Sequence, residues 1–337
     1  MLRRYIESRE RYFHGKDTSR VSLPFEWGFE FIGLKPQENR GSLHGLMDFA
    51  SRTLQASDDF FSYEPTPKYS LDGETLRFPS YLETAYPENN TVWGRYFTAS
   101  GDVAVVVLPQ WNCGWDGHVR LCRLLQRAGI ASVRLSLPYH HFRKPPHLQR
   151  PEYMVSSNLG QTLQATRQAV LDVRRTADWL LTRGYKKLAI LGSSLGSCVA
   201  FLTFAHDDRF ASGVFIHVSG YFADVVWEGL STKHVRASLE NHISLEQLRQ
   251  IWAPISPLPY VRRLKNTTRR ILMFAGRYDP TFLPRLSKQL FDEFDGQRVP
   301  YQPRWLPCGH YTMAQFPFSA VIAKDAIRFL RAEQGRR

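Results

Sequence analysis

No stretch of the 337-residue sequence is hydrophobic for long enough to cross a bilayer. The longest apolar runs, such as Val103 to Leu108, fall far short of the roughly 20 residues that a membrane-spanning helix needs. The chain starts with charged residues and lacks the apolar segment of a secretory signal. We therefore expect a soluble, cytoplasmic protein with no transmembrane segment.

Cysteine is also scarce. Cys113, Cys122, Cys198 and Cys308 stand far apart, with no Cys-x-x-Cys pair and no paired Cys/His spacing. This pattern is not that of a zinc site or of a disulfide framework. We predict no metal and no organic cofactor.

Repeats, low-complexity segments and an arginine-rich tail are absent as well. The net charge is +13, but the basic residues are scattered, often in pairs such as Arg174-Arg175 and Arg269-Arg270. A scattered charge is typical of a solvated basic surface, so no nucleic-acid partner is expected. With 43 % hydrophobic and 22 % charged residues, the composition is that of a globular protein with a sizeable core.

The pattern of apolar residues divides the chain into two regions. In residues 1–70, which we interpret as an N-terminal accessory region, apolar residues from Leu2 to Phe13 and from Leu43 to Leu54 recur at helical spacing. Residues 71–337 alternate between apolar runs and helical periods, the longest helix being expected from Asn158 to Arg183. The runs read as strands are Leu76–Ser80, Thr91–Phe97, Val103–Leu108, Ala131–Leu135, Leu188–Leu191, Gly213–Ile216 and Ile271–Phe274.

This alternation predicts an α/β fold with a mostly parallel central sheet and helices on both faces. Several runs are uniformly apolar, as strands buried on both faces are. In such sheets the ligand crevice lies at the carboxyl ends of the strands. The residues just after each strand are therefore the candidates for chemistry.

One strand is followed by Gly192-Ser193-Ser194-Leu195-Gly196. A serine at the tip of so tight a strand-to-helix turn has a strained backbone, and side chains two residues to either side would clash, so glycine is needed there. The helix that follows directs its first N–H groups toward any negative charge beside Ser194. Ser194 is our candidate nucleophile.

A serine nucleophile needs a base and a third group that orients the base. Asp279 follows the strand that ends at Phe274, and His310 follows a last expected strand near Trp305. Asp224 is the rival acid, although it begins an apparent insertion. The rival bases His140, His141 and His217 come too early in the chain.

From about Leu76 onward the sequence resembles the α/β-hydrolase superfamily, near its esterase-like and dienelactone-hydrolase-like branch. The resemblance implies the α/β-hydrolase fold, with Ser194 as nucleophile, Asp279 as acid and His310 as base. It also implies an oxyanion hole built from the N–H of Leu195 and a second donor in the loop 108–112. Many relatives carry His-Gly in that loop, where this chain has Pro-Gln, so the second donor is Trp111 or, alternatively, Gln110.

Three weaker features complete the prediction. Residues 222–266 exceed an ordinary connection and contain a capping box beginning at Ser244, so we expect a helical cap over the site. His141, Arg143 and Lys144 are candidate ligands for a substrate carboxylate or phosphate, against a solvated loop. The cysteines close to the site are expected to be packing residues rather than redox switches; these are Cys113, Cys198 and Cys308.

Together these features predict a serine hydrolase that cleaves a small-molecule or lipid-like carboxylic ester through an acyl-enzyme. The same residues could serve an acyltransferase, an amidase or a thioesterase. A binding protein that keeps the fold without catalysis is the alternative from a different class.

Overall fold

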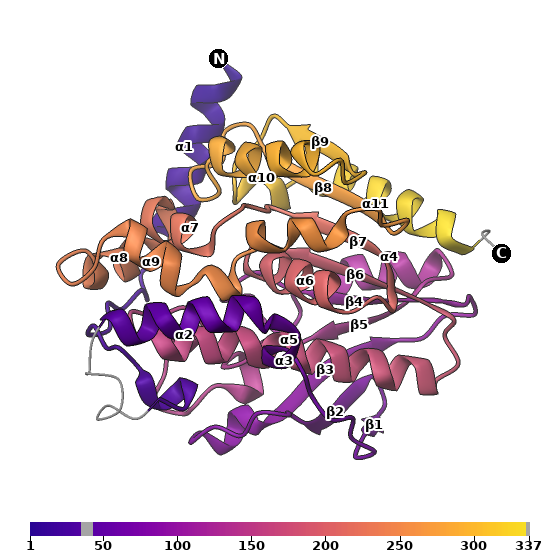
Figure 1. The fold of residues 1–337 in the computed structure, drawn as a ribbon. Helices are drawn as coiled ribbons and strands as arrows, with labels where there is room; N and C mark the ends of the chain where they lie inside the picture. Colours follow the sequence, from indigo (N-terminus) through magenta and orange to yellow (C-terminus); the bar gives the residue numbers. More distant parts are fainter. Residues whose placement is uncertain (35–42, 335–337) are drawn as a thin grey trace.

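In the computed structural model, which describes residues 1–34 and 43–334, nine strands form one sheet in the order β1-β2-β3-β5-β4-β6-β7-β8-β9 (Figure 1). The sheet is parallel from β5 through β9, whereas β1, β2 and β3 pair antiparallel. The strands are β1 Ser70–Asp72, β2 Thr75–Pro79, β3 Thr91–Phe97, β4 Val103–Leu108, β5 Ala131–Leu135, β6 Lys187–Ser193, β7 Phe210–Ile216, β8 Arg270–Gly276 and β9 Gln302–Leu306.

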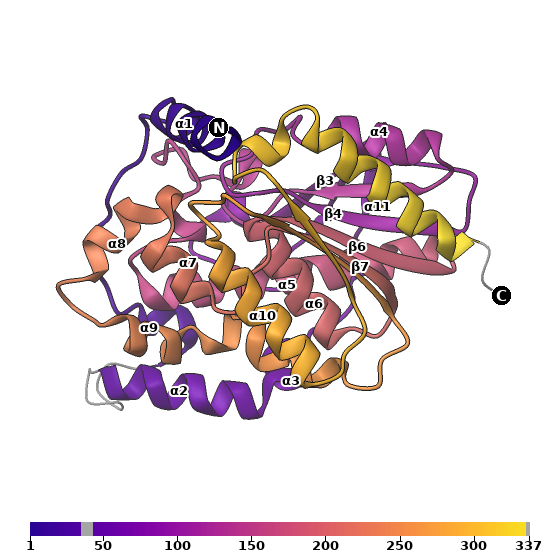
Figure 2. The same ribbon diagram turned by 90° about the horizontal axis from the view of Figure 1, so that it is seen from above.

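Helices cover both faces of the sheet (Figure 2). Strand β4 shows why two cores form: Ala104 and Val106 pack with α5 and α6, while Val105 and Val107 pack on the opposite face with α4 and α11. The helices are α1 Leu2–Gly15, α2 Leu43–Gln55, α3 Ser57–Phe60, α4 Val119–Arg127, α5 Leu159–Thr182, α6 Leu195–His206, α7 Phe222–Glu228, α8 Lys233–Leu239, α9 Leu245–Ile251, α10 Pro284–Gly296 and α11 Phe318–Gln334.

The mostly parallel sheet with helices on both faces is confirmed, and each strand read from the sequence is present. The long helix is α5, which begins after Asn158, whose side chain accepts a hydrogen bond from the Gln161 N–H at 2.9 Å. Strand β1 was not predicted, because its three residues are exposed and carry no apolar pattern.

The N-terminal region is divided between two sides of the molecule. Helix α1 lies near the β9 end of the sheet (Figure 1), and α2 packs on the far side against α9 (Figure 2). Phe29, Leu46 and Phe61 are buried in the same core as α5. Residues 35–42, which belong to this region, lie outside the description.

The insertion 222–266 between β7 and β8 is helical, as expected of a cap, and contains α7, α8 and α9. The capping box at α9 is formed: Ser244 Oγ accepts from the Gln247 N–H at 3.2 Å, and the Gln247 side chain accepts from the Ser244 N–H at 2.8 Å. Across the described residues, no helix has both the length and the apolar character to span a membrane.

Candidate active site

The turn between β6 and α6 holds Ser194 in a strained backbone conformation, with φ 54° and ψ −121°. The two glycines that flank it have no room for a side chain. A Cβ on Gly192 would lie 2.1 Å from the Gly196 carbonyl oxygen, and one on Gly196 would lie 2.4 Å from the Leu108 oxygen. The Ser194 N–H is bonded to the Ile216 oxygen of the neighbouring strand at 2.8 Å. Local sterics therefore fix this serine at the carboxyl edge of the sheet.

The loops after β8 and β9 bring Asp279 and His310 to the same edge. Ser194 Oγ lies 3.3 Å from His310 Nε2, and His310 Nδ1 lies 3.2 Å from Asp279 Oδ2. Because an ionised carboxylate only accepts, the imidazole carries its proton on Nδ1, and this leaves Nε2 free to accept from the serine hydroxyl. The three side chains thus form one hydrogen-bonded chain.

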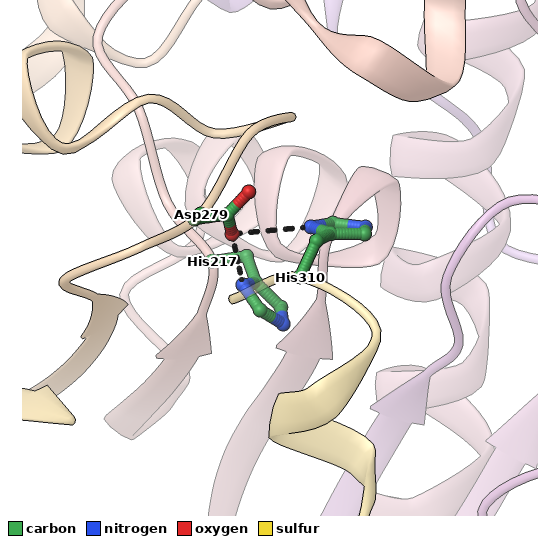
Figure 3. Close-up of side chains that lie close together, drawn as sticks. All are labelled: His217, Asp279 and His310. Atoms are coloured by element: carbon green, nitrogen blue, oxygen red, sulfur yellow. Dashed lines mark hydrogen bonds and ion pairs between the residues drawn. The ribbon is translucent and has the colours of Figure 1, made fainter. Parts of the chain in front are cut away.

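Asp279 is held on both of its oxygens. Oδ1 accepts the N–H groups of Thr281 and Phe282, each at 2.7 Å. Oδ2 accepts from His310 and, at 2.9 Å, from Nδ1 of His217. Figure 3 shows both histidines directed at this one oxygen. The ring of Phe282 stacks nearly parallel on that of His310, with 5.4 Å between centroids and a 2° interplanar angle.

His217 is a member of the site that the sequence did not predict as a partner of Asp279. It follows β7 directly, and its ring centroid lies 4.4 Å from that of His310. In the sequence His217 is only a rival base, which chain order disfavours. Chain order argues against a base at this position, but not against a second donor to the acid. The signal was available, since His217 stands just after a strand, as the other site residues do.

Burial and the two histidines act in opposite directions on the pKa of Asp279. Burial raises the pKa of Asp279, but the charge of His310 and the hydrogen bonds from His217 and His310 outweigh it and hold that pKa well below its usual range. Burial, together with the nearby charge of His310, lowers the pKa of His217, although Asp279 opposes the shift. The arrangement therefore combines an ionised Asp279 with a neutral His217.

The same side chains offer the ligand atoms a metal would use. One atom from each of His217, Asp279 and His310 lies within 4.8 Å of the others. Asp279 Oδ2 already accepts from both histidines, so a metal here would displace both protons and, with them, the hydrogen bond that orients His310. The donor set fits an oriented base better than a metal centre.

The loop after β4 lies beside the serine, and His140 shapes it. Nδ1 of His140 donates to the Pro138 oxygen at 2.8 Å, and Nε2 accepts the Asn112 N–H at 3.1 Å. Burial lowers the pKa of His140 to about 3, which keeps the ring neutral and leaves Nε2 able to accept. The Trp111 indole donates to the Pro151 oxygen at 3.0 Å and stacks on His234.

The structure assigns other roles to two predicted residues. Asp224 lies in α7, fully buried and paired with Arg249 at 2.5 Å, whereas Asp279 is the carboxylate that contacts His310. Arg143 is also fully buried, and its guanidinium pairs with Asp172 at 2.9 Å. A substrate anion cannot reach Arg143, so the prediction that it binds substrate is wrong.

The neighbours of Arg143 also have partners within the protein. His141 is bonded through Nε2 to the Cys113 oxygen at 2.6 Å and lies 2.8 Å from Ser136 Oγ through Nδ1. The Lys144 ammonium donates to the Leu148 oxygen. A role for His141 and Lys144 in binding substrate stays a prediction.

All four cysteines are buried and free. The Cys198 thiol donates to the Ile255 oxygen at 3.3 Å. Burial raises the pKa values of the Cys113, Cys198 and Cys308 thiols, which keeps them protonated and weakly reactive. These properties suit packing residues.

The insertion 222–266, which we predict to be a cap, contacts the loops on which the site is built. The Leu230 N–H donates to the oxygen of Pro280 on the acid loop at 2.9 Å. Ser231 Oγ lies 2.8 Å from the hydroxyl of Tyr311, the residue after His310. His234 stacks on Trp111 of the loop after β4, with centroids 5.6 Å apart. The insertion thus adjoins the acid, the base and the predicted oxyanion loop.

Comparison with known proteins finds a family profile and solved structures that are similar to this chain. The family profile described as "Alpha/beta hydrolase domain containing 18" matches residues 117–252. An acetyl xylan esterase from Paenibacillus sp. R4 aligns with 85 % of this chain and 94 % of its own length, at a TM-score of 0.59 and 16 % identity. The chain has the α/β-hydrolase fold.

Two other solved structures share this α/β-hydrolase fold. An esterase from Pyrococcus furiosus aligns over 82 % of this chain and 94 % of its own length, at a TM-score of 0.52 and 14 % identity. The acylaminoacyl peptidase of Pyrococcus horikoshii aligns over 80 % of this chain and 41 % of its own length, at a TM-score of 0.58 and 12 % identity. None of the curated proteins compared by sequence matches the chain.

Proposed function

We propose that this α/β-hydrolase-fold protein is a serine hydrolase that cleaves carboxylic esters through an acyl-enzyme. The observation that carries the proposal is the hydrogen-bonded chain from Ser194 Oγ through His310 to Asp279 Oδ2. The esterases among the structural neighbours support an ester as substrate.

In the first step His310 Nε2 takes the hydroxyl proton as Ser194 Oγ bonds to the acyl carbon. Asp279 stabilises the resulting imidazolium and stays ionised throughout. His310 then gives its proton to the leaving alcohol oxygen as the ester C–O bond breaks, and the acyl group stays on Ser194. In the second step His310 takes a proton from water as the water oxygen bonds to the acyl carbon. His310 then gives this proton to Ser194 Oγ as the bond between the acyl group and the serine breaks, and the carboxylic acid is released.

The oxyanion formed in each step needs donors near Ser194. Leu195 is the first residue of α6, so its N–H has no acceptor within the helix. In the loop after β4, Pro109 has no N–H and the Asn112 N–H is bonded to His140. The N–H of Trp111, with that of Gln110 as the alternative, is therefore proposed as the second donor. Each donor would contribute about 3 kcal/mol to lowering the barrier.

Acyl transfer, thioester cleavage and amide cleavage would use the same side chains with a different acceptor or leaving group. The acylaminoacyl peptidase among the structural neighbours is the specific reason to keep amide cleavage as the second candidate. A small-molecule or lipid-like ester stays our predicted substrate, and the cytoplasm our predicted location.

The test is a panel of esters of graded acyl length, with matched amides and thioesters, assayed on the wild type and on Ser194→Ala. We expect ester hydrolysis that Ser194→Ala abolishes, and the acyl length with the highest kcat/KM identifies the substrate class. Turnover of amides alone would favour the second candidate. A folded wild type without turnover of any member would favour a binding protein.

A further inference from the structure

The loop that carries His310 is fastened to the rest of the molecule by a carboxylate at the far end of the chain. Glu10, in α1, is fully buried. Its Oε2 accepts the Tyr311 N–H at 3.0 Å and its Oε1 accepts the Thr312 N–H at 2.8 Å. Burying a carboxylate is costly unless it is hydrogen-bonded, and these two bonds engage both of its oxygens.

Glu10 also packs closely against Gly309, the residue before His310. A Cβ on Gly309 would lie 2.6 Å from Glu10 Oε1. The Gly309 N–H in turn donates to Thr312 Oγ1 at 2.8 Å. Glu10 therefore adjoins the backbone directly before the histidine and binds the backbone directly after it.

Tyr311 adds a second tie between the N-terminal region and this loop. Its hydroxyl lies 3.3 Å from Nη2 of Arg20 and 2.8 Å from Ser231 Oγ of the cap. Its ring lies against Phe13 and His14 of α1, with centroids 6.4 and 6.5 Å apart. In Figure 2, α1 accordingly lies beside the chain that leads into α11.

We propose that Glu10 is a positioning residue for His310, and that α1 thereby completes the active site. This inference rests on the proposed function. Nε2 of His310 lies 3.3 Å from Ser194 Oγ, at the long end of a productive contact, and a displacement of about 1 Å in such a base can cost about a hundredfold in rate. Strand β9 ends at Leu306, before the histidine loop, and the backbone of that loop is bonded to the acid loop through the Tyr278 N–H, which donates to the Cys308 oxygen at 3.0 Å. Glu10 holds the other side of His310, at Tyr311 and Thr312.

The test compares Glu10→Ala and Glu10→Gln with Glu7→Gln as the matched control. Glu7 lies on the same helix and pairs with Arg3 on its surface. We expect Glu10→Ala to lower kcat about tenfold to a hundredfold with KM nearly unchanged, because only the base moves. Glu10→Gln, which keeps one acceptor oxygen, should recover part of the loss. Glu7→Gln should match the wild type.

A second readout does not depend on turnover. With isotope-labelled histidine, the Nδ1–H of His310 that donates to Asp279 should give a protected NMR signal in the wild type. That signal should weaken or vanish in Glu10→Ala and persist in Glu7→Gln. If the wild type cleaves no ester, the proposed function fails, and this signal still decides the role of Glu10.

Two results would overturn the inference. One is a folded Glu10→Ala protein with wild-type kcat and an unchanged His310 signal. The other applies if Glu10→Ala does not fold: a Glu10→Gln protein that melts several degrees lower, yet has wild-type kcat and signal, would show a purely structural role.

Discussion

The turn that carries Ser194 and the loop that carries His310 are fixed by different means. The serine turn is fixed by the backbone of residues 192–196 and of the strands beside them, which approach so closely that the two glycine positions have no room for a side chain. The histidine loop has a backbone bond from Tyr278 to Cys308 and, in addition, is held by side chains from other parts of the chain: Glu10 and, through Tyr311, Arg20 and Ser231. Close backbone packing thus positions the nucleophile, and side-chain hydrogen bonds from distant parts of the chain help to position the base.

The largest effect is expected at the serine turn. In Gly196→Ala, the new Cβ would lie 2.4 Å from the Leu108 oxygen and 2.5 Å from the Pro109 oxygen, backbone atoms that cannot move without disturbing β4. We expect a loss of more than about 4 kcal/mol in the free energy of unfolding, measured by chemical denaturation, and no turnover.

Gly296→Ala is the control, because a Cβ there meets nothing within 4 Å at the end of α10. It should change the free energy of unfolding by about 1 kcal/mol or less. A Gly196→Ala protein with wild-type stability and activity would remove the basis for a sterically fixed nucleophile.

The next effect separates the acid that serves His310 from its rival. Asp279→Asn keeps the shape of the side chain but removes the charge that stabilises the imidazolium, so kcat should fall about 10³-fold to 10⁴-fold. Asp224→Asn, the same substitution at an equally buried carboxylate paired with Arg249, should lower the melting temperature and leave kcat within a few fold. The reverse pattern in kcat would restore Asp224 as the acid.

A smaller effect is expected at the second histidine. His217→Ala removes a hydrogen bond to the Asp279 carboxylate, worth about 1.5 kcal/mol, so kcat/KM should fall about tenfold. His217→Asn is the matched control, since asparagine tolerates the φ of 58° and presents a donor near the position of Nδ1.

Two outcomes would contradict this role. A His217→Ala protein identical to the wild type would make the contact with Asp279 incidental. A loss as complete as that in His310→Ala would make His217 a base in its own right.

The smallest effect is a dependence of stability on pH. Burial lowers the pKa of His140 to about 3 and also lowers that of His217, so the native state binds fewer protons than the unfolded state as the pH falls below about 6.5. Above about pH 6.5 these two histidines should thus not reduce the free energy of unfolding. At about pH 5, protonation of each histidine in the unfolded state should lower the free energy of unfolding by at most about 2 kcal/mol. Denaturation across this range measures the slope, which His140→Asn should flatten. A slope that the substitution leaves unchanged would place the loss elsewhere.

The difference between the two loops also explains which features could be predicted from the sequence. The strands are readable because buried parallel strands need uniformly apolar residues, and Ser194 is readable because its turn needs glycine at both sides. Asp279 and His310 could be inferred because the fold sets where strands end. These signals are all contained in a few adjacent residues.

The other features depend on partners that are distant in the sequence. Glu10 has the pattern of a surface residue on a short helix, and only the fold reveals that it meets residues 301 and 302 positions away. Arg143 follows a strand, as a substrate ligand would, but its partner Asp172 lies on the buried face of α5. No local pattern distinguishes a buried ion pair from an exposed basic loop.

The most direct measurement is the intact mass of the protein after treatment with a fluorophosphonate, a reagent that phosphonylates activated serines. We expect a single adduct on Ser194 in the wild type, no adduct in Ser194→Ala, and a greatly slowed reaction in His310→Ala. A folded wild type that stays unmodified, or an adduct that persists in Ser194→Ala, would contradict it.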